Sequence, residues 1–127
     1  MATQFYPIAK VRLNRDNWID ARTQLWAQTA LLPDQDYVGV YYHYSEDGHE
    51  CDFAIASTTP NSAEPVVIEE LTWYDKTLTH EADLAQTWQS IARKARQGML
   101  PRALSVDFEK RLPEGKVELY IAVRPHC

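Results

Sequence analysis

The sequence predicts an α+β protein in which a β-α-β-β unit occurs twice with pseudo-twofold symmetry. Each half contains one segment with helical spacing of its apolar residues and several segments with strand-like alternation. The halves also superpose without a gap at an offset of 66 residues, which places Tyr37 on Ala103. We therefore expect an antiparallel sheet, two helices on one face and a central groove between a first repeat of about residues 4–57 and a second of about 65–125.

The first repeat opens with alternating apolar positions, and Pro7 is compatible with a strand only near its start or on an edge. Residues 14–17 supply helix-capping side chains, and Trp18, Leu25 and Trp26 follow at helical spacing. A polar turn at 45–50 separates two further strand-like segments. The expected order is a strand over 5–13, a helix over 18–32 and strands over 37–44 and 51–56.

The second repeat follows a loop rich in Thr, Pro, Asn and Ser at 58–65. Its helix carries Leu84, Trp88 and Ile91 on one stripe and is broken by Gly98. The last strand alternates aliphatic residues with Glu118, Tyr120 and Ala122, so one face is aliphatic and the other polar. The expected elements are an extended segment over 66–77, a helix from 84 and strands over 103–112 and 117–123.

Length and composition limit the number of domains and the classes of function that the chain can have. A chain of 127 residues is expected to form a single domain, spanning 1–127, without disulfides or a metal. The net charge of −5 and the scattered 13 Lys and Arg residues argue against direct nucleic-acid binding. No apolar run is long enough to cross a membrane and no secretory signal is evident, so we expect a cytoplasmic protein.

No cofactor or metal motif is evident. The sequence has no Ser-His-Asp order, Gly-rich phosphate loop or zinc-ligand spacing. Cys51 and Cys127 do not have metal-ligand spacing, and Cys51 is expected in the core or at an edge. A metal held by His43 and His49 is conceivable, but surface histidines are the simpler interpretation. We therefore expect no cofactor and no metal.

Four short motifs resemble the GyrI-like small-molecule-binding superfamily, which includes the DNA gyrase inhibitory protein and effector-binding domains of AraC-type and MerR-type multidrug regulators. The order, spacing and twofold repetition of these motifs are more specific than any one of them. The motifs are Val38-Gly39-Val40-Tyr41-Tyr42, Cys51-Asp52, Met99-Leu100-Pro101 and Val117-Glu118-Leu119-Tyr120-Ile121-Ala122-Val123-Arg124-Pro125.

The resemblance implies a groove that takes amphipathic, often cationic, aromatic molecules, with Glu118 among aromatic rings and Asp52 at the equivalent place in the first repeat. Val106 and Phe108 stand where the family often has a second Glu and a Tyr, so a second carboxylate in the groove is in question unless Asp107 or Glu109 substitutes for it. A lipophilic cation is bound by aromatic faces and an ionised carboxylate. The candidate ligand-binding residues are Tyr41, Tyr42, Asp52, Trp73, Trp88, Phe108, Glu118 and Tyr120.

Three functions follow from the sequence and the resemblance. The first is a stand-alone protein that captures cationic aromatic compounds without transforming them. The second is a protein–protein regulator of gyrase or of a transcription regulator. The third is a hydrolase of cyclopropane-containing xenobiotics with Glu118 as general base. In the empty protein, Glu118 is expected to accept a hydrogen bond from a tyrosine hydroxyl or to take up a proton, which a bound cation would then release.

Overall fold

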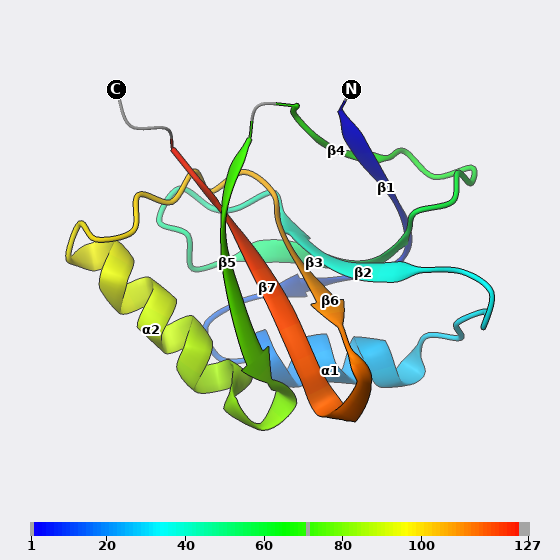
Figure 1. The fold of residues 1–127 in the computed structure, drawn as a ribbon, viewed down its shortest axis with the longest axis horizontal. Coiled ribbons are helices and arrows are strands. Elements are labelled where there is room, and N and C mark those ends of the chain that lie inside the picture. The colour runs from blue at the N-terminus through cyan, green and yellow to red at the C-terminus, as the bar shows by residue number, and fades with distance from the viewer. Residues whose placement is uncertain (1, 71, 125–127) are drawn as a thin grey trace.

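The computed structural model describes residues 2–70 and 72–124, and Figure 1 shows the arrangement of the elements. Cys127 and His126, which the sequence assigned to the chain end, lie outside these residues. The elements in chain order are β1 (Thr3–Leu13), α1 (Trp18–Gln28), β2 (Tyr37–Tyr42), β3 (Cys51–Ser57), β4 (Val66–Ile68), β5 (Trp73–His80), a 3-10 turn (Glu81–Asp83), α2 (Leu84–Arg96), β6 (Asp107–Arg111), a second 3-10 turn (Pro113–Gly115) and β7 (Lys116–Val123).

The strands form one seven-stranded antiparallel sheet in the order β4-β1-β3-β2-β6-β7-β5. The order β1-β3-β2 in the first repeat is mirrored by β5-β7-β6 in the second, which confirms the duplicated α+β architecture. The repeats meet where β2 pairs with β6 through Gly39↔Glu109, Val40↔Phe108 and Tyr41↔Asp107.

The gapless offset of 66 does not hold for both strands of each hairpin. Val40 pairs with Ala54 in the first repeat, whereas Phe108 pairs with Tyr120 in the second. An offset of 66 places Ala54 on Tyr120 but Val40 on Val106, two residues away from Phe108. The second hairpin is therefore shorter, because the 3-10 turn at Pro113–Gly115 replaces the longer polar loop of the first. Because the hairpins differ by two residues, an even number, each side chain stays on the face of the sheet that the offset predicts.

Several predicted element boundaries were wrong, including the end of the strand predicted over 37–44, which is Tyr42. The first helix ends at Gln28 rather than 32, because Thr29 adopts an extended backbone and its hydroxyl donates to the Leu25 carbonyl at 2.6 Å. The segment predicted over 66–77 forms two strands: β4 pairs with β1, while β5 pairs with β7. The strand predicted over 103–112 is regular only at Asp107–Arg111.

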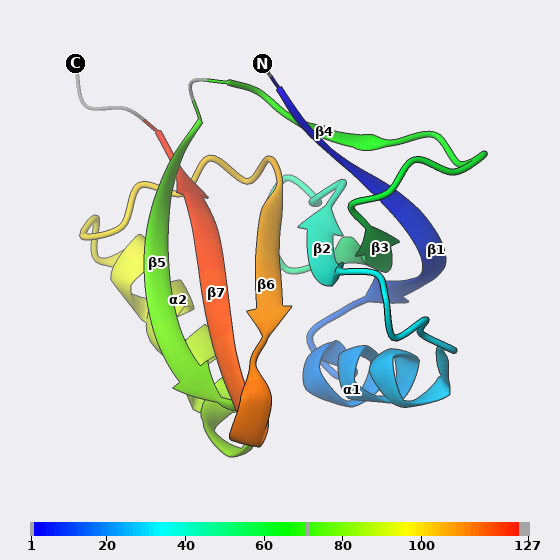
Figure 2. The same ribbon diagram turned by 45° about the vertical axis from the view of Figure 1, so that its right-hand side comes forward.

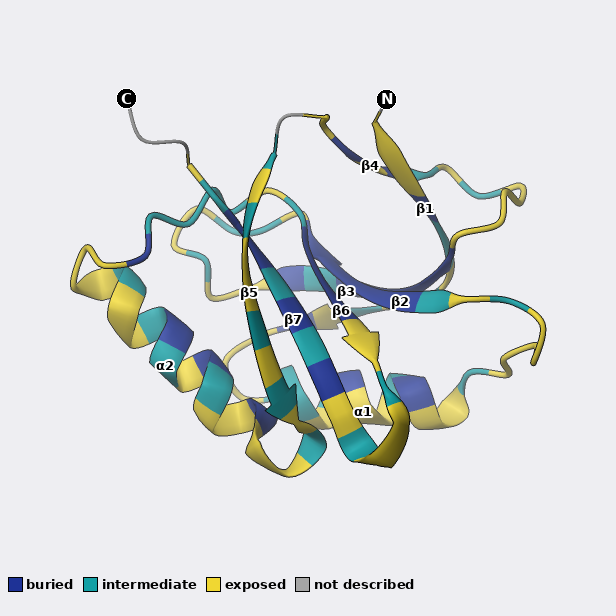
Figure 3. Ribbon diagram, viewed as in Figure 1, coloured by how far each residue is buried: buried dark blue, intermediate teal, exposed yellow. Residues whose placement is uncertain are grey.

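Both helices pack on one face of the sheet, as the sequence predicted. Trp26 of α1 and Trp88 of α2 belong to one buried cluster with inward side chains of β3 and β7, such as Phe53 and Leu119. In the view of Figure 3, the buried positions are concentrated in the central strands and on the sides of the helices that face the sheet. No helix within residues 2–70 and 72–124 is long and apolar enough to cross a membrane.

The opposite face is concave. Phe5 of β1 contacts Phe108 of β6 with ring centroids 5.4 Å apart, although β3 and β2 lie between these strands in the sheet. The contact requires a strongly curled sheet, and Figure 2 shows β1 and β4 crossing over toward the second half. The concave face holds a second buried cluster that includes Val38, Val40 and Tyr42. The curl therefore makes this face of the sheet concave and brings β1 of the first repeat close to β6 of the second.

Candidate functional site

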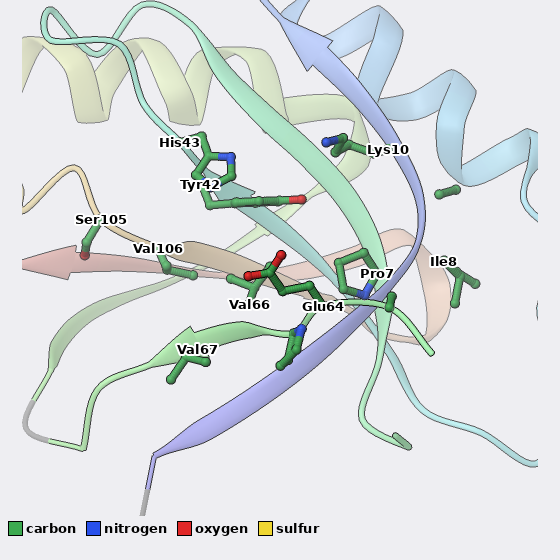
Figure 4. Close-up of a pocket in the computed structure, with 13 residues that line it drawn as sticks. Pro7, Ile8, Lys10, Tyr42, His43, Glu64, Val66, Val67, Ser105 and Val106 are labelled. Atoms are coloured by element: carbon green, nitrogen blue, oxygen red, sulfur yellow. The ribbon is translucent and has the colours of Figure 1, made fainter. Parts of the chain in front are cut away.

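A cavity of about 740 Å³ opens on the concave face between β1, the end of β2, the β3–β4 connection and the segment before β6. Its wall includes Pro7, Lys10, Tyr42, His43, Glu64 and Val106, which Figure 4 shows around a common space. These side chains come from both repeats, because Val106 is supplied by the second and the others by the first repeat or the chain that follows it. The cavity is therefore a product of the duplicated fold.

A bulge in β1 shapes one side of the cavity. Pro7 pairs with Ala56 and Ala9 with Ile55, so Ile8 is an extra residue in β1. A bulge bends its strand and redirects the neighbouring side chains. Pro7 lacks a backbone N–H and is tolerated at such a break in the ladder. Pro7, which the sequence allowed only near the start of a strand or on an edge, therefore lies at a bulge beside the cavity.

Tyr42 and His43 form the second side, and His43 pairs with the neighbouring Asp52. Tyr42 is 7% exposed, and burial, with the nearby Asp52 charge, raises the pKa of its hydroxyl. Asp52 accepts from His43 Nδ1 at 2.8 Å and from Arg12 Nη1 at 3.3 Å. Although burial raises the pKa of Asp52, these two hydrogen bonds hold it below its ordinary value. Asp52 is thus an ionised carboxylate whose charge is already matched.

Glu64 lines the cavity, and within the described chain its carboxylate has no basic partner of the kind that Asp52 has. Its side chain is exposed and is directed into the cavity beneath the ring of Tyr42 (Figure 4). It forms no hydrogen bond or ion pair with the residues that the structure describes. Lys10 lines the same cavity from β1. The cavity therefore offers one uncommitted carboxylate, one aromatic wall and one opposing ammonium group.

The centre of the concave face is filled by aromatic rings rather than hollow. Phe108 stacks on Tyr120 with centroids 4.4 Å apart and planes 9° apart. Tyr74 meets Phe108 edge-on at 5.2 Å, and its hydroxyl donates to the Val106 carbonyl at 2.8 Å. Burial raises the pKa of Tyr74. The predicted central groove is consequently displaced to one side, where the cavity lies.

Glu118 lies on the concave face, but its acceptors are occupied. Its Oε2 is 3.1 Å from Lys76 Nζ, and its Oε1 accepts from the Tyr120 hydroxyl at 3.2 Å. The bond from Lys76 and that from Tyr120 lower the pKa of Glu118, so the carboxylate stays ionised in the empty protein. Of the two states expected from the sequence, the tyrosine-bonded one is found. Lys76 and Lys110 also lie over the Tyr120 ring, 5.8 and 5.4 Å from its centroid.

The predicted ligand-binding residues divide between three places. One set shares the concave face: Tyr42, Asp52, Phe108, Glu118 and Tyr120. Tyr41 and Trp88 instead belong to the helix-side core. Trp73 lies at the start of the edge strand β5 and is 54% exposed. Of the eight predicted residues, Tyr42 alone lines the cavity; the other four on the concave face lie beside it, and Tyr41, Trp88 and Trp73 lie elsewhere.

Tyr41 lies on the opposite face because side chains alternate along its strand, and Trp88 lies there because α2 packs on that face. Tyr41 alternates with Tyr42 along β2, so only one of them can face the concave side. The fully buried Tyr41 hydroxyl donates to Glu109 Oε1 at 2.6 Å. The same carboxylate accepts from Arg22 and from Trp26 Nε1, at 2.9 Å for the latter. Tyr41 therefore belongs to a buried polar network that joins the two repeats.

Sequence reasoning missed Lys10, His43 and Glu64 as cavity residues, whereas the resemblance had placed Val106 at a groove position. Glu64 lies in the 58–65 segment, where composition indicates only a loop. Lys10 and His43 carry no local signal beyond strand alternation and proximity to a turn. Among the described residues, no group of three or more His, Cys, Asp and Glu side chains is arranged to hold a metal ion.

Comparison with known proteins identifies the fold. No protein-family model matches the sequence, and no curated protein matches it. The integron cassette protein VCH_CASS2 from the mobile metagenome of Vibrio cholerae has a similar structure, with a TM-score of 0.73 and 18% identity over 97% of this chain and 91% of that one. SAV2435, solved bound to tetraphenylphosphonium, has a TM-score of 0.67 and 10% identity over 97% of this chain and 89% of that one. At these identities the likeness concerns the fold.

Proposed function

We propose that this protein captures amphipathic, cationic aromatic small molecules in the concave cavity, as the resemblance to GyrI-like domains implies. The observation that carries the proposal is the uncommitted Glu64 carboxylate in a cavity of about 740 Å³ walled by Tyr42. The fold shared with SAV2435, which was solved with tetraphenylphosphonium, supports the same class of ligand. The proposed binding residues are Tyr42, Glu64 and, at the margin, Asp52, Phe108, Glu118 and Tyr120.

Glu64 is the acid best suited to meet a ligand cation. A cation that approaches Asp52 must compete with Arg12 and His43, and one that approaches Glu118 must displace Lys76. Glu64 has no such partner among the described residues. The face of Tyr42 adds a cation–π attraction of about 0.5 to 2 kcal/mol. Glu64 therefore takes the role that the sequence assigned to Glu118.

The state of Glu118 favours binding over hydrolysis. A general base works best when its pKa lies near the operating pH. Lys76 and Tyr120 instead lower the pKa of Glu118, which makes it a poor acceptor of a proton from water. Binding of a cation in this cavity would also release no proton from Glu118, because that group is already ionised. We therefore expect the titration of Glu118 to contribute nothing to the pH dependence of the affinity around neutrality.

The proposal is tested by calorimetric titration with tetraphenylphosphonium and with tetraphenylborate, ions of nearly the same shape and opposite charge. We expect the wild-type protein to bind the cation more tightly than the anion. Glu64→Gln should weaken cation binding about fivefold, the upper range for an exposed ion pair. Glu46→Gln, an equal charge change in the exposed β2–β3 turn, is the matched control and should leave the affinity unchanged.

Two further variants separate the roles of the charged residues. Lys10→Gln removes the opposing ammonium group and should strengthen cation binding by about two- to fivefold. Glu118→Gln should change the affinity less than Glu64→Gln, because Lys76 already neutralises Glu118. Equal binding of the two ions, or a Glu64→Gln variant indistinguishable from wild type, would refute the proposed site.

A further inference from the structure

The concave cavity has a basic side as well as an acidic one. Lys10 lines it from β1 and His43 from the end of β2, whereas Glu64 lines it from the β3–β4 connection. In the view of Figure 4, the Tyr42 ring lies between Glu64 on one side and Lys10 and His43 on the other. A ligand that carries only a cation therefore meets Glu64 but has the Lys10 ammonium group as a repulsive neighbour.

Strand register places the Lys10 side chain on the concave face. Lys10 pairs with Ala54, and Arg12, two residues further along β1, pairs with Asp52. Side chains directly opposite each other on paired strands share a face, as do residues two apart on one strand. Ala54 belongs to the buried cluster of the concave face, so Lys10 and Arg12 both stand on that face. The basic side of the cavity is therefore a consequence of how β1 pairs with β3.

The Lys10 ammonium group has no carboxylate partner within residues 2–70 and 72–124. The nearest candidate is Asp52: burial raises its pKa, hydrogen bonds from His43 and Arg12 lower it, and the charge of Lys10 lowers it further. Both Asp52 oxygens are nevertheless taken, because Oδ2 is 2.8 Å from His43 Nδ1 and Oδ1 is 3.3 Å from Arg12 Nη1. The exposed ammonium group of Lys10 is consequently available to an anion in the cavity.

Glu64 and Lys10 are attached at different levels along β1. Val66, two residues after Glu64, pairs with Phe5, and Lys10 is five residues further along the same strand. A rise of about 3.3 Å per residue gives at most about 16 Å between the two levels, and the bulge at Ile8 shortens this span. The two charges therefore suit the opposite ends of an elongated ligand.

We propose that the preferred ligands of the concave cavity are elongated aromatic zwitterions, in which a cationic nitrogen meets Glu64 and a carboxylate at the far end meets Lys10. This inference rests on the proposed function, because it needs the same cavity and the same contact with Glu64. The carboxylate turns the repulsion from Lys10 into an ion pair, and hydrogen bonds between charged partners are about twice as strong as neutral ones. The aromatic part of the ligand packs on Tyr42, which borders the space between the two charges.

Rhodamine B and its ethyl ester are matched probes, because they share one cationic ring system and differ only in a free carboxylate against an uncharged ester. Fluorescence anisotropy titration gives the affinity of each. We expect the wild-type protein to bind rhodamine B about three- to fivefold more tightly than the ester, the range for an ion pair that solvent reaches. Lys10→Gln should weaken rhodamine B binding, strengthen binding of the ester and so remove the preference. Lys94→Gln, the same charge change on the exposed surface of α2, is the matched control and should keep it.

Glu64→Gln separates this inference from the proposed function. It should weaken binding of both probes about fivefold and leave the ratio of their affinities as in the wild type. If the ester binds in a Glu64-dependent way but rhodamine B binds no more tightly, the zwitterion preference is overturned while capture of cations stands. If neither probe depends on Glu64, both proposals fail. An affinity ratio that Lys10→Gln leaves unchanged, or that Lys94→Gln changes equally, also overturns the role of Lys10. Both Lys10 and Glu64 are exposed, so neither substitution disturbs the core.

Discussion

Replacing Glu109 with Gln isolates the charge that joins the two repeats. Glu109 is fully buried, and its Oε2 accepts from Arg22 Nε at 2.8 Å, from Arg22 Nη2 and from Trp26 Nε1. A glutamine amide has nearly the same shape, and its oxygen can keep these bonds while the Tyr41 hydroxyl rotates to accept from the amide nitrogen. The variant therefore removes the charge and little else.

The remaining partner of the buried guanidinium is Glu81, whose side chain is 28% exposed. Removing one member of a buried ion pair costs about 3 to 5 kcal/mol, because the other charge is left in a poorly solvated place. Since Glu81 continues to balance part of the Arg22 charge, we expect Glu109→Gln to lower the free energy of unfolding by about 3 kcal/mol. Glu81 is only partly buried, so Glu81→Gln should cost less, about 1 kcal/mol.

Urea denaturation measures both changes. With a slope of about 2 kcal/mol per M, the expected loss for Glu109→Gln moves the midpoint down by about 1.5 M. Glu81→Gln, which changes the same guanidinium's other partner, is the control and should move the midpoint far less. Equal shifts in the two variants, or a loss below about 1 kcal/mol for Glu109→Gln, would contradict the view that the charge at this position holds the repeats together.

Two other outcomes follow from packing and from titration. A Cβ at Gly39 would lie 2.7 Å from Phe53 Cζ, so Gly39→Ala should overpack the centre of the sheet and cost about 1 to 3 kcal/mol in chemical denaturation; unchanged stability would show that Phe53 can move aside. Burial raises the pKa of Tyr41, Tyr44 and Tyr74, so folding favours their neutral forms. Their contribution to stability is complete below about pH 10, the ordinary tyrosine pKa, and is lost as the pH rises further. Denaturation midpoints measured between pH 8 and 11 should fall above pH 10, and less steeply in Tyr74→Phe; a flat profile would contradict the burial of these phenols.

The faces of the strands could be predicted because strand alternation is a local property. Glu118 and Tyr120 were placed on one face from their spacing alone, and the structure places them there. The end of the first helix could not be predicted, because Leu31 and Leu32 continue the apolar pattern although they are 40% and 55% exposed. Residues that continue a pattern without being buried give a false signal of helix length.

The sequence could not predict which charged side chains would pair with one another. Glu118 meets Lys76 only because β5 pairs with β7 and sets Lys76 beside Tyr120 across the ladder. Asp52 meets Arg12 because β1 pairs with β3. Such pairings depend on which strands become neighbours, and residue spacing does not encode this. Tertiary structure therefore decided which acids on the concave face have a charged partner.

The sequence by itself determined the duplicated architecture, the approximate position of each helix and the alternation of side chains between two faces in most strands, because all three depend on short-range periodicity and on repetition along the chain. Only the tertiary structure decided that aromatic rings fill the centre of the concave face and that the open space lies beside them at Tyr42 and Glu64. A cavity is the volume left after side chains from distant segments have packed, so its position follows from their three-dimensional meeting.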